Sequence, residues 1–239
     1  MSILSIFKKK EPPVIEFWST IIGIENIAPP ELAIKCLPAW IKNMPGESGG
    51  IGRSETARQC PAFIDYFKQG YVLKLWCDLK LEIREDGSYF YETPNNQWEF
   101  SNHGDDQFIN HMPDTNKYSI VLKAISPWRM RTPKGWSVLQ LPMFYDYNPN
   151  FEVLPGVFDA DIHFDTTPQM CFYKYGTYYL ERGTPLCMFV PFKREEIKGK
   201  ISPLTNELIN VTQTGYQWWA GKFKGGYREH QKSLKGEIK

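Results

Sequence analysis

Four residues of chemically active types occupy alternate positions in the stretch GVFDADIHFD: Asp159, Asp161, His163 and Asp165. Carboxylates and imidazoles are the groups that proteins use to move protons and to bind metal ions. Side chains two residues apart lie on the same face of a strand. If this stretch is a strand, His163 and Asp165 face the same way. We therefore take these four residues as candidate binding residues.

Two residues of the preceding PWRMRTPKGW segment, Arg131 and Trp136, complete the set of candidate binding residues. A polar loop earlier in the chain holds further residues of metal-binding types, namely His103, Asp105, Asp106 and His111. Their spacing matches no standard ligand motif. The sequence therefore predicts no metal site, no cofactor and no complete catalytic set.

The C-terminal tail interleaves aromatic and basic residues. Its aromatic members are Trp218, Trp219, Phe223 and Tyr227. Such interleaving can stack on single-stranded nucleic acid, but terminal tryptophans more often dock onto their own domain or onto a partner chain. We expect these four residues to contact a protein partner or, through self-association, a second copy of this chain.

The composition limits the function classes. The chain has 239 residues, a formal net charge of +1, 15% aromatic residues, eight Trp and eighteen Pro. A near-neutral chain has no overall field that would recruit nucleic acid or an anionic membrane. Its aromatic and proline content favours strands and rigid loops over a helical bundle.

The cysteines and the N-terminus indicate the compartment. Five cysteines without a CxxC pair argue against both a disulfide framework and a zinc knuckle. The start MSILSIFKKKEPP places its lysines after a short apolar run, unlike a signal peptide. We expect no secretion by a signal peptide, no membrane insertion, and a location in the host cytoplasm or on a virion.

Alternation of apolar and polar residues predicts a mainly β fold, jelly-roll-like or β-clip-like, as a sandwich or closed barrel with a few short helices and extended terminal arms. The expected strands are residues 14–24, 71–84 as one or two strands, 89–93, 97–101, 117–124, 135–141 and a closing strand that ends at 192. Short helices are expected at 31–36 and 56–68, and Arg129 and Arg131 in a loop. The expected organisation is an arm at 1–13, one β-rich domain at 14–213 and a tail at 214–239.

The segments PWRMRTPKGWSVLQL, FEVLPGVFDADIHFD and YYLERGTPLCMFVPF resemble an uncharacterised bacterial and bacteriophage family of β-sandwich domains. LPAWIK at 37–42 and CPAFIDYFKQGY at 60–71 support the resemblance. It implies a fold and a phage-related origin, without an activity.

A more distant resemblance is to the trimeric dUTPase and dCTP deaminase barrel, because GVFDADIHF and GTPLCMF take similar relative places to two of its motifs. It implies that Asp159 activates water and that Asp161 is a second acid. Ile162 replaces an aromatic residue of that family, and the GRS at 52–54 lies about a hundred residues from where its phosphate-binding motif belongs.

The pair His163 and Asp165 also resembles the HxD pair of iron and 2-oxoglutarate oxygenases, which add a distal histidine. The later histidine of this chain, His230, lies in a polar tail without a strand pattern.

Two function classes follow. The preferred one is a non-enzymatic structural or interaction protein that assembles through aromatic loops and terminal arms. The alternative is a small-molecule enzyme or binding protein, nucleotide hydrolase-like or oxygenase-like, with a site near Asp159, Asp161 and His163.

Overall fold

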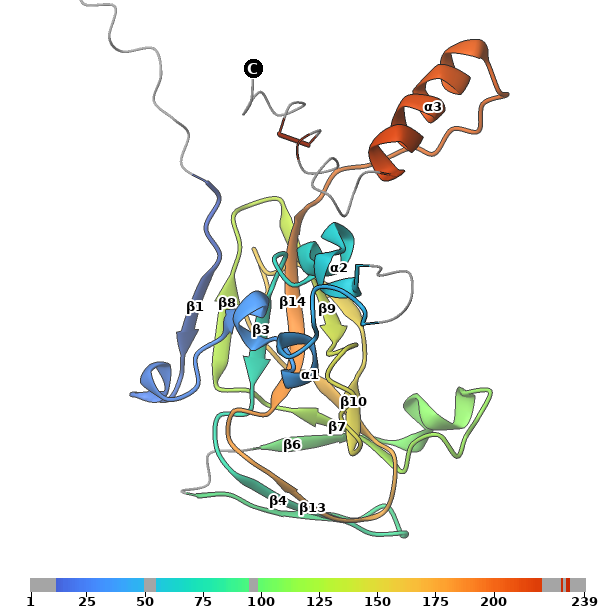
Figure 1. Ribbon diagram of the computed structural model, residues 1–239. Coiled ribbons are helices and arrows are strands. Elements are labelled where there is room, and N and C mark those ends of the chain that lie inside the picture. The colour runs from blue at the N-terminus through green and yellow to red at the C-terminus, as the bar shows by residue number, and fades with distance from the viewer. Residues whose placement is uncertain (1–11, 50–54, 95–98, 221–228, 230, 233–239) are drawn as a thin grey trace, which may run out of the picture. The chain divides into compact units, whose positions relative to one another are not determined.

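The computed structural model describes residues 12–49, 55–94, 99–220, 229 and 231–232, and these residues are mainly β (Figure 1). The chain divides into two compact units: residues 1–30 with 71–194, and residues 31–70 with 195–239. Each unit is described by itself. Within the described residues no helix is long and apolar enough to cross a membrane.

The described residues of the first unit contain thirteen strands: β1 (Glu16–Ser19), β3 (Tyr71–Lys74), β4 (Leu79–Ile83), β5 (Tyr89–Glu92), β6 (Phe100–His103), β7 (Ile120–Ala124), β8 (Trp128–Arg131), β9 (Trp136–Pro142), β10 (Phe151–Val153), β11 (Gly156–Phe158), β12 (Gln169–Phe172), β13 (Gly176–Leu180) and β14 (Pro185–Lys193). Short 3-10 helices lie at Ile24–Asn26, Asp105–Gln107 and Ile109–His111. All strand pairs within this unit are antiparallel.

The strands of the first unit form four open sheets. Their orders are β1-β8, β10-β12-β7-β6, β11-β9-β14-β3 and β13-β4-β5. Figure 1 shows β14 between β3 and β9, as the pairing requires. The mainly β, sandwich-like prediction is therefore confirmed, whereas a closed barrel is wrong for the described residues. The finer jelly-roll or β-clip assignment stays a prediction.

One hydrophobic core joins these sheets. Alternate residues of β4, Leu79, Leu81 and Ile83, are at most 2% exposed, while the residues between them are half-buried. The same core takes Leu122 from β7 and Phe189 from β14. Because each sheet contributes one apolar face to this core, the sheets stabilise one another.

The second unit contains β2 (Glu31–Leu32), the 3-10 helices Ala33–Cys36 and Ala57–Gln59, and the helices α1 (Ala39–Lys42), α2 (Pro61–Tyr66) and α3 (Asn206–Ala220). The helix predicted at 31–36 is thus a two-residue strand followed by a 3-10 turn. The helix predicted at 56–68 begins with Pro61 in its first turn, where its missing N–H costs nothing. The strand predicted at 14–24 is shorter, because Gly23 has φ +88 and a 3-10 helix follows it.

Two other predictions needed correction. The segment with Arg129 and Arg131 is strand β8 and not a loop, because it pairs with β1, from Glu16 opposite Arg131 to Ser19 opposite Trp128. Asp159 to Ile162 form a turn after β11 instead of continuing a strand. The predicted division into arm, domain and tail stays a prediction.

Candidate functional site

The predicted acidic cluster lies on a tight turn. The backbone N–H groups of Ile162 and His163 both donate to the carbonyl oxygen of Asp159, at 3.0 and 2.9 Å. Beyond this turn the chain runs beside β8, with Met130 N–H donating to the Phe164 carbonyl at 2.9 Å. His163 and Asp165 are therefore placed by a turn and a short extended segment.

A bidentate ion pair fixes the turn. Arg194, which directly follows β14, donates from Nη1 to Oδ1 of Asp161 at 2.9 Å and from Nη2 to its Oδ2 at 2.5 Å. The Gly135 N–H donates to the same Oδ2 at 2.8 Å. Gly135 has φ +82 in the turn before β9, and its carbonyl accepts from Arg194 N–H at 2.8 Å. The contacts join three distant segments of the first unit.

Asp159 belongs to the same network. Its Oδ1 accepts from the buried Ser137 hydroxyl at 2.5 Å and lies 2.8 Å from Arg194 Nη1. These bonds lower the pKa of Asp159, with Ser137 as the largest cause. Arg194 and the Gly135 N–H lower the pKa of Asp161 to about 2. A general base works best with a pKa near the working pH, so both carboxylates are poor bases.

His163 and Asp165 lie on the other side of the turn. Asp165 forms a 2.6 Å ion pair with Arg129 Nε on β8, and its side chain is 48% exposed. The next residue, Thr166, donates its hydroxyl to the Trp128 carbonyl at 2.8 Å. This segment is therefore held against β8, while His163 and Asp165 still reach solvent.

These two residues line a cavity of about 170 Å³ within the first unit. The lining residues are Gln140, Gly156, Val157, Phe158, His163, Asp165, Thr167 and Gln169. The Gln140 side chain donates from Nε2 to the Leu154 carbonyl at 2.8 Å, which fixes its carboxamide. β11 pairs with β9 and forms the edge of its sheet. The cavity thus combines amides, an imidazole, a carboxylate and a strand edge.

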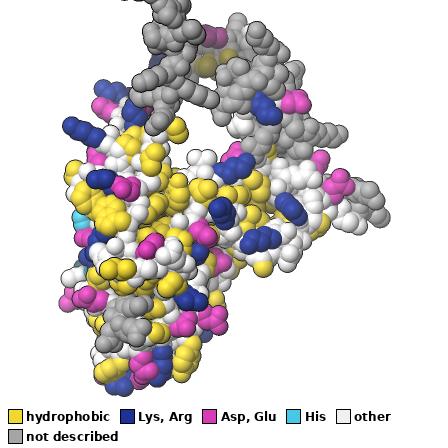
Figure 2. Space-filling model, turned by 90° about the vertical axis from the view of Figure 1, so that its left-hand side faces the viewer, with side chains coloured by type: hydrophobic (Ala, Val, Ile, Leu, Met, Phe, Trp, Pro, Cys, Tyr) yellow, Lys and Arg dark blue, Asp and Glu magenta, His cyan; other side chains and the backbone are white. Residues whose placement is uncertain are grey.

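The cavity does not include Arg131 and Trp136, the two candidate binding residues that lie outside the GVFDADIHFD stretch. Arg131 pairs with Glu16 of β1 at 2.5 Å, and Trp136 is half-buried at the start of β9, opposite Lys193. Figure 2 shows the side on which β1 lies in Figure 1, where hydrophobic side chains are exposed among charged ones. Trp18 of β1 contacts Phe164, with ring centroids 5.7 Å apart.

No group of three potential metal ligands occurs among the described residues. In the polar loop, His103 Nδ1 lies 2.8 Å from Gln107 Oε1, and His111 Nε2 lies 2.8 Å from the Asp106 carbonyl. His230 and the GRS at 52–54 lie outside the described residues. The oxygenase alternative thus has His163 and Asp165 but no third ligand within the part of the chain that is described.

The predicted partner-contact residues stay predictions. Trp218 and Trp219 lie within α3. Phe223 and Tyr227 lie outside the described residues. The sequence did not point to three side chains of this region: the carboxamides of Gln140 and Gln169 and the guanidinium of Arg194. The signal available for Arg194 was its place directly after the closing strand.

No family model matches this chain, and no curated protein matches it. Solved structures do match. A dUTPase of Staphylococcus bacteriophage 80alpha is 12% identical, with a TM-score of 0.33, over 58% of this chain and 85% of that one. A dUTPase from phage phi11 of S. aureus is 13% identical, with a TM-score of 0.32, over 58% and 85%. Another 80alpha dUTPase structure, with dUpNHpp, is 13% identical, with a TM-score of 0.32, over 58% and 78%.

These neighbours belong to the class named by the remote sequence resemblance, at a low level of similarity. They correct one prediction. We expected a non-enzymatic structural or interaction protein, but the phage proteins found are dUTPases, and one is described by its enzymatic activity.

Proposed function

We propose that this chain binds a nucleotide-class ligand in the cavity between β9, β11 and β12, and hydrolyses it. The observation that carries the proposal is the lining of that cavity, where two carboxamides lie with His163 and Asp165. The network of Asp159, Asp161 and Arg194 serves to position the turn that presents these two residues.

The carboxamides suit the edge of a nucleobase. A carboxamide offers an acceptor and donors in one plane, and a base edge presents donors and acceptors in the same way. The Gln140 amide nitrogen donates one of its two hydrogens to Leu154, so the oxygen and the second N–H are left for a ligand. Gln169 and Thr167 supply further polar groups, and the exposed edge of β11 supplies backbone groups.

The hydrolytic step follows from the remaining pair. An imidazole and a carboxylate in one cavity can orient a water molecule and accept its proton as it attacks phosphorus, while a phosphoanhydride P–O bond breaks and the departing phosphate group leaves as an anion. Asp165 is paired with Arg129 at 2.6 Å, so the role of base falls to the imidazole of His163. In this proposal His163 is catalytic, and Asp159 and Asp161 are positioning residues.

The binding test uses the full chain and the four deoxynucleoside triphosphates, with calorimetry for binding. Gln169→Leu should weaken binding about ten-fold, because a buried base edge would lose its partner. Gln213→Leu changes an exposed glutamine of α3 and should leave binding within about two-fold. If none of the four triphosphates binds at millimolar concentration, the proposal is refuted.

Phosphate release separates the enzyme from a binding protein. His163→Gln should lower the rate of release at least about a hundred-fold while binding changes little, since the imidazole acts on water. An unchanged rate in this variant would show that His163 takes no part in hydrolysis. Only the binding part of the proposal would then remain.

A further inference from the structure

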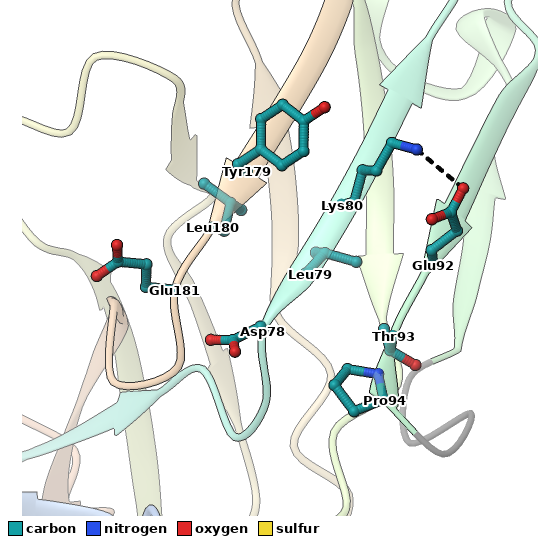
Figure 3. A pocket seen from close by; sticks show the side chains of 9 residues that line it. All are labelled: Asp78, Leu79, Lys80, Glu92, Thr93, Pro94, Tyr179, Leu180 and Glu181. Atoms are coloured by element: carbon teal, nitrogen blue, oxygen red, sulfur yellow. Dashed lines mark hydrogen bonds and ion pairs between the residues drawn. The ribbon is translucent and has the colours of Figure 1, made fainter.

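A second and larger cavity, of about 390 Å³, lies at one end of the β13-β4-β5 sheet (Figure 3). Asp78 directly precedes β4, Thr93 and Pro94 follow β5, and Glu181 follows β13. Leu180 pairs with Leu79, and Glu92 pairs with Lys80, so these segments leave the sheet at the same end. The cavity shares no lining residue with the site proposed above.

The wall of this cavity is partly apolar. Leu79 and Leu180 form its buried part, at 2% and 4% exposed, and Pro94 adds a rigid ring. Tyr179 is 72% exposed and lies opposite Lys80 in the register of β13 and β4. A large exposed aromatic ring beside an apolar hollow offers a surface for the hydrocarbon part of a ligand.

The polar part of the wall carries an excess of negative charge. It has three carboxylates, Asp78, Glu92 and Glu181, against the single ammonium of Lys80, an excess of two. Lys80 is already paired with Glu92 at 2.9 Å, as Figure 3 shows. Asp78 accepts the Arg182 N–H through Oδ1 at 2.8 Å, and no described residue pairs with the Glu181 carboxylate. Among the described residues, Asp78 and Glu181 are thus left without a cation.

The wall also contains a hydroxyl without a partner. Thr93 Oγ1 is buried and has no hydrogen bond within the part of the chain that is described. Buried polar groups without partners are rare in folded proteins, and a bound ligand is one way to satisfy them. The oxygen has almost no accessible surface, so a ligand in the cavity reaches it only if the segment that carries Thr93 shifts.

We propose that this cavity binds an organic cation, an ammonium or guanidinium group on a short apolar chain. The apolar chain packs on Pro94 and on the ring of Tyr179, which also contributes a cation–π contact, and the cation meets the carboxylates of Asp78 and Glu181. A free amine and a basic side chain of a peptide share this chemistry. Anionic ligands are disfavoured, because the two unpaired carboxylates repel them.

Agmatine is the first probe, measured by calorimetry on the full chain at low salt, with 1-pentanol as an uncharged probe of similar length. Glu181→Gln should weaken agmatine binding about five-fold, and Tyr179→Ala by a similar factor. Glu85→Gln removes an exposed carboxylate from the distant end of the same hairpin and should change binding less than about two-fold. Both test residues are exposed, so neither change should unfold the chain.

A second arm uses an arginine-containing tripeptide. Binding of agmatine and the tripeptide, or of the tripeptide alone, supports the cation site. Comparing the affinities for agmatine and the tripeptide tells whether the natural source is a free amine or a protein side chain. Equal weakening by Glu181→Gln and Glu85→Gln would overturn the proposal, because binding would then follow net charge alone. Equal affinity for 1-pentanol, or no binding of either cation, would also overturn it. Neither result bears on the nucleotide site.

Discussion

Phe172→Ala should lower the free energy of unfolding by about 3–5 kcal/mol. Phe172 on β12 is fully buried, and its ring centroid lies 5.6 Å from that of Phe151 on β10. It also lies 5.0 Å from the ring of Tyr178 on β13, which belongs to a different sheet. Because the ring fills space between two sheets, neither sheet can close the cavity without losing its own pairing. Urea unfolding followed by circular dichroism measures the change.

Phe144→Ala is the matched control. Phe144 follows β9 and is 55% exposed, so its loss should change the free energy of unfolding by no more than about 0.5 kcal/mol. The dependence of the unfolding free energy on urea should be the same in both variants, because each unfolds the same surface. A loss for Phe172→Ala as small as that of the control would contradict the placement of Phe172 between two sheets.

Local features of the fold could be predicted from the sequence. The Asp86-Gly87 pair predicts the turn between β4 and β5, and Gly87 adopts φ +79 there. Asp86 Oδ1 accepts the Ser88 N–H at 2.9 Å, which closes the turn within three residues. Such turns depend on neighbouring residues alone, so the sequence pattern contains the information needed.

Strand β8 was missed because its partner is far away in the chain. Pro127 and two arginines favour a loop, but Trp128 and Met130 alternate with half-buried or exposed arginines and are at most 2% exposed. That alternation was visible in the sequence. It was too short to outweigh the loop signal, since the stabilising pairing with β1 spans more than a hundred residues.

The candidate site was predicted in part. His163 and Asp165 were found by residue type, and the structure places both in one cavity. Gln140 and Gln169 were not found, because glutamine is common at surfaces and the cavity arises where separate strands meet. Asp161 was taken as a candidate binding residue, yet its side chain is 5% exposed and bound by Arg194. Residue type alone cannot tell a reactive carboxylate from one that fixes a turn.

Arg194→Met should release the turn that carries His163 and Asp165. Methionine retains much of the apolar side chain but removes the guanidinium that binds Asp159 and Asp161. The Asp161 carboxylate then keeps the Gly135 N–H as its partner in this network. Hydrogen exchange at residues 160–165 should become about ten-fold faster, because local opening becomes easier, while exchange in β4 stays unchanged.

Lys198→Met removes an equal charge from an exposed position, where the lysine side chain is 85% exposed. Exchange at residues 160–165 should not change in this control, since exposed ion pairs contribute little. Faster exchange in both variants would show that net charge, and not the network, protects the turn.

The pH dependence gives an independent check on the same network. The pKa of Asp161 is lowered from 3.8 to about 2, and that of Asp159 is lowered too, so the folded chain binds these protons less readily than the unfolded chain. Their stabilising effect is complete above the unfolded pKa and is lost as the pH falls through the folded pKa. In the Arg194→Met variant the part of this effect that comes from the guanidinium is lost, while the Ser137 hydroxyl still lowers the pKa of Asp159 and the Gly135 N–H still lowers that of Asp161.

The melting temperatures of the wild type and of Arg194→Met should therefore differ most near pH 5 and converge as the pH falls to about 2. Part of the convergence comes from the variant, because its two neighbouring carboxylates repel each other until one is protonated. A difference that stays constant over this range would mean that Arg194 stabilises the turn by packing and not by its charge. That outcome would leave Asp159 and Asp161 free for a role in binding.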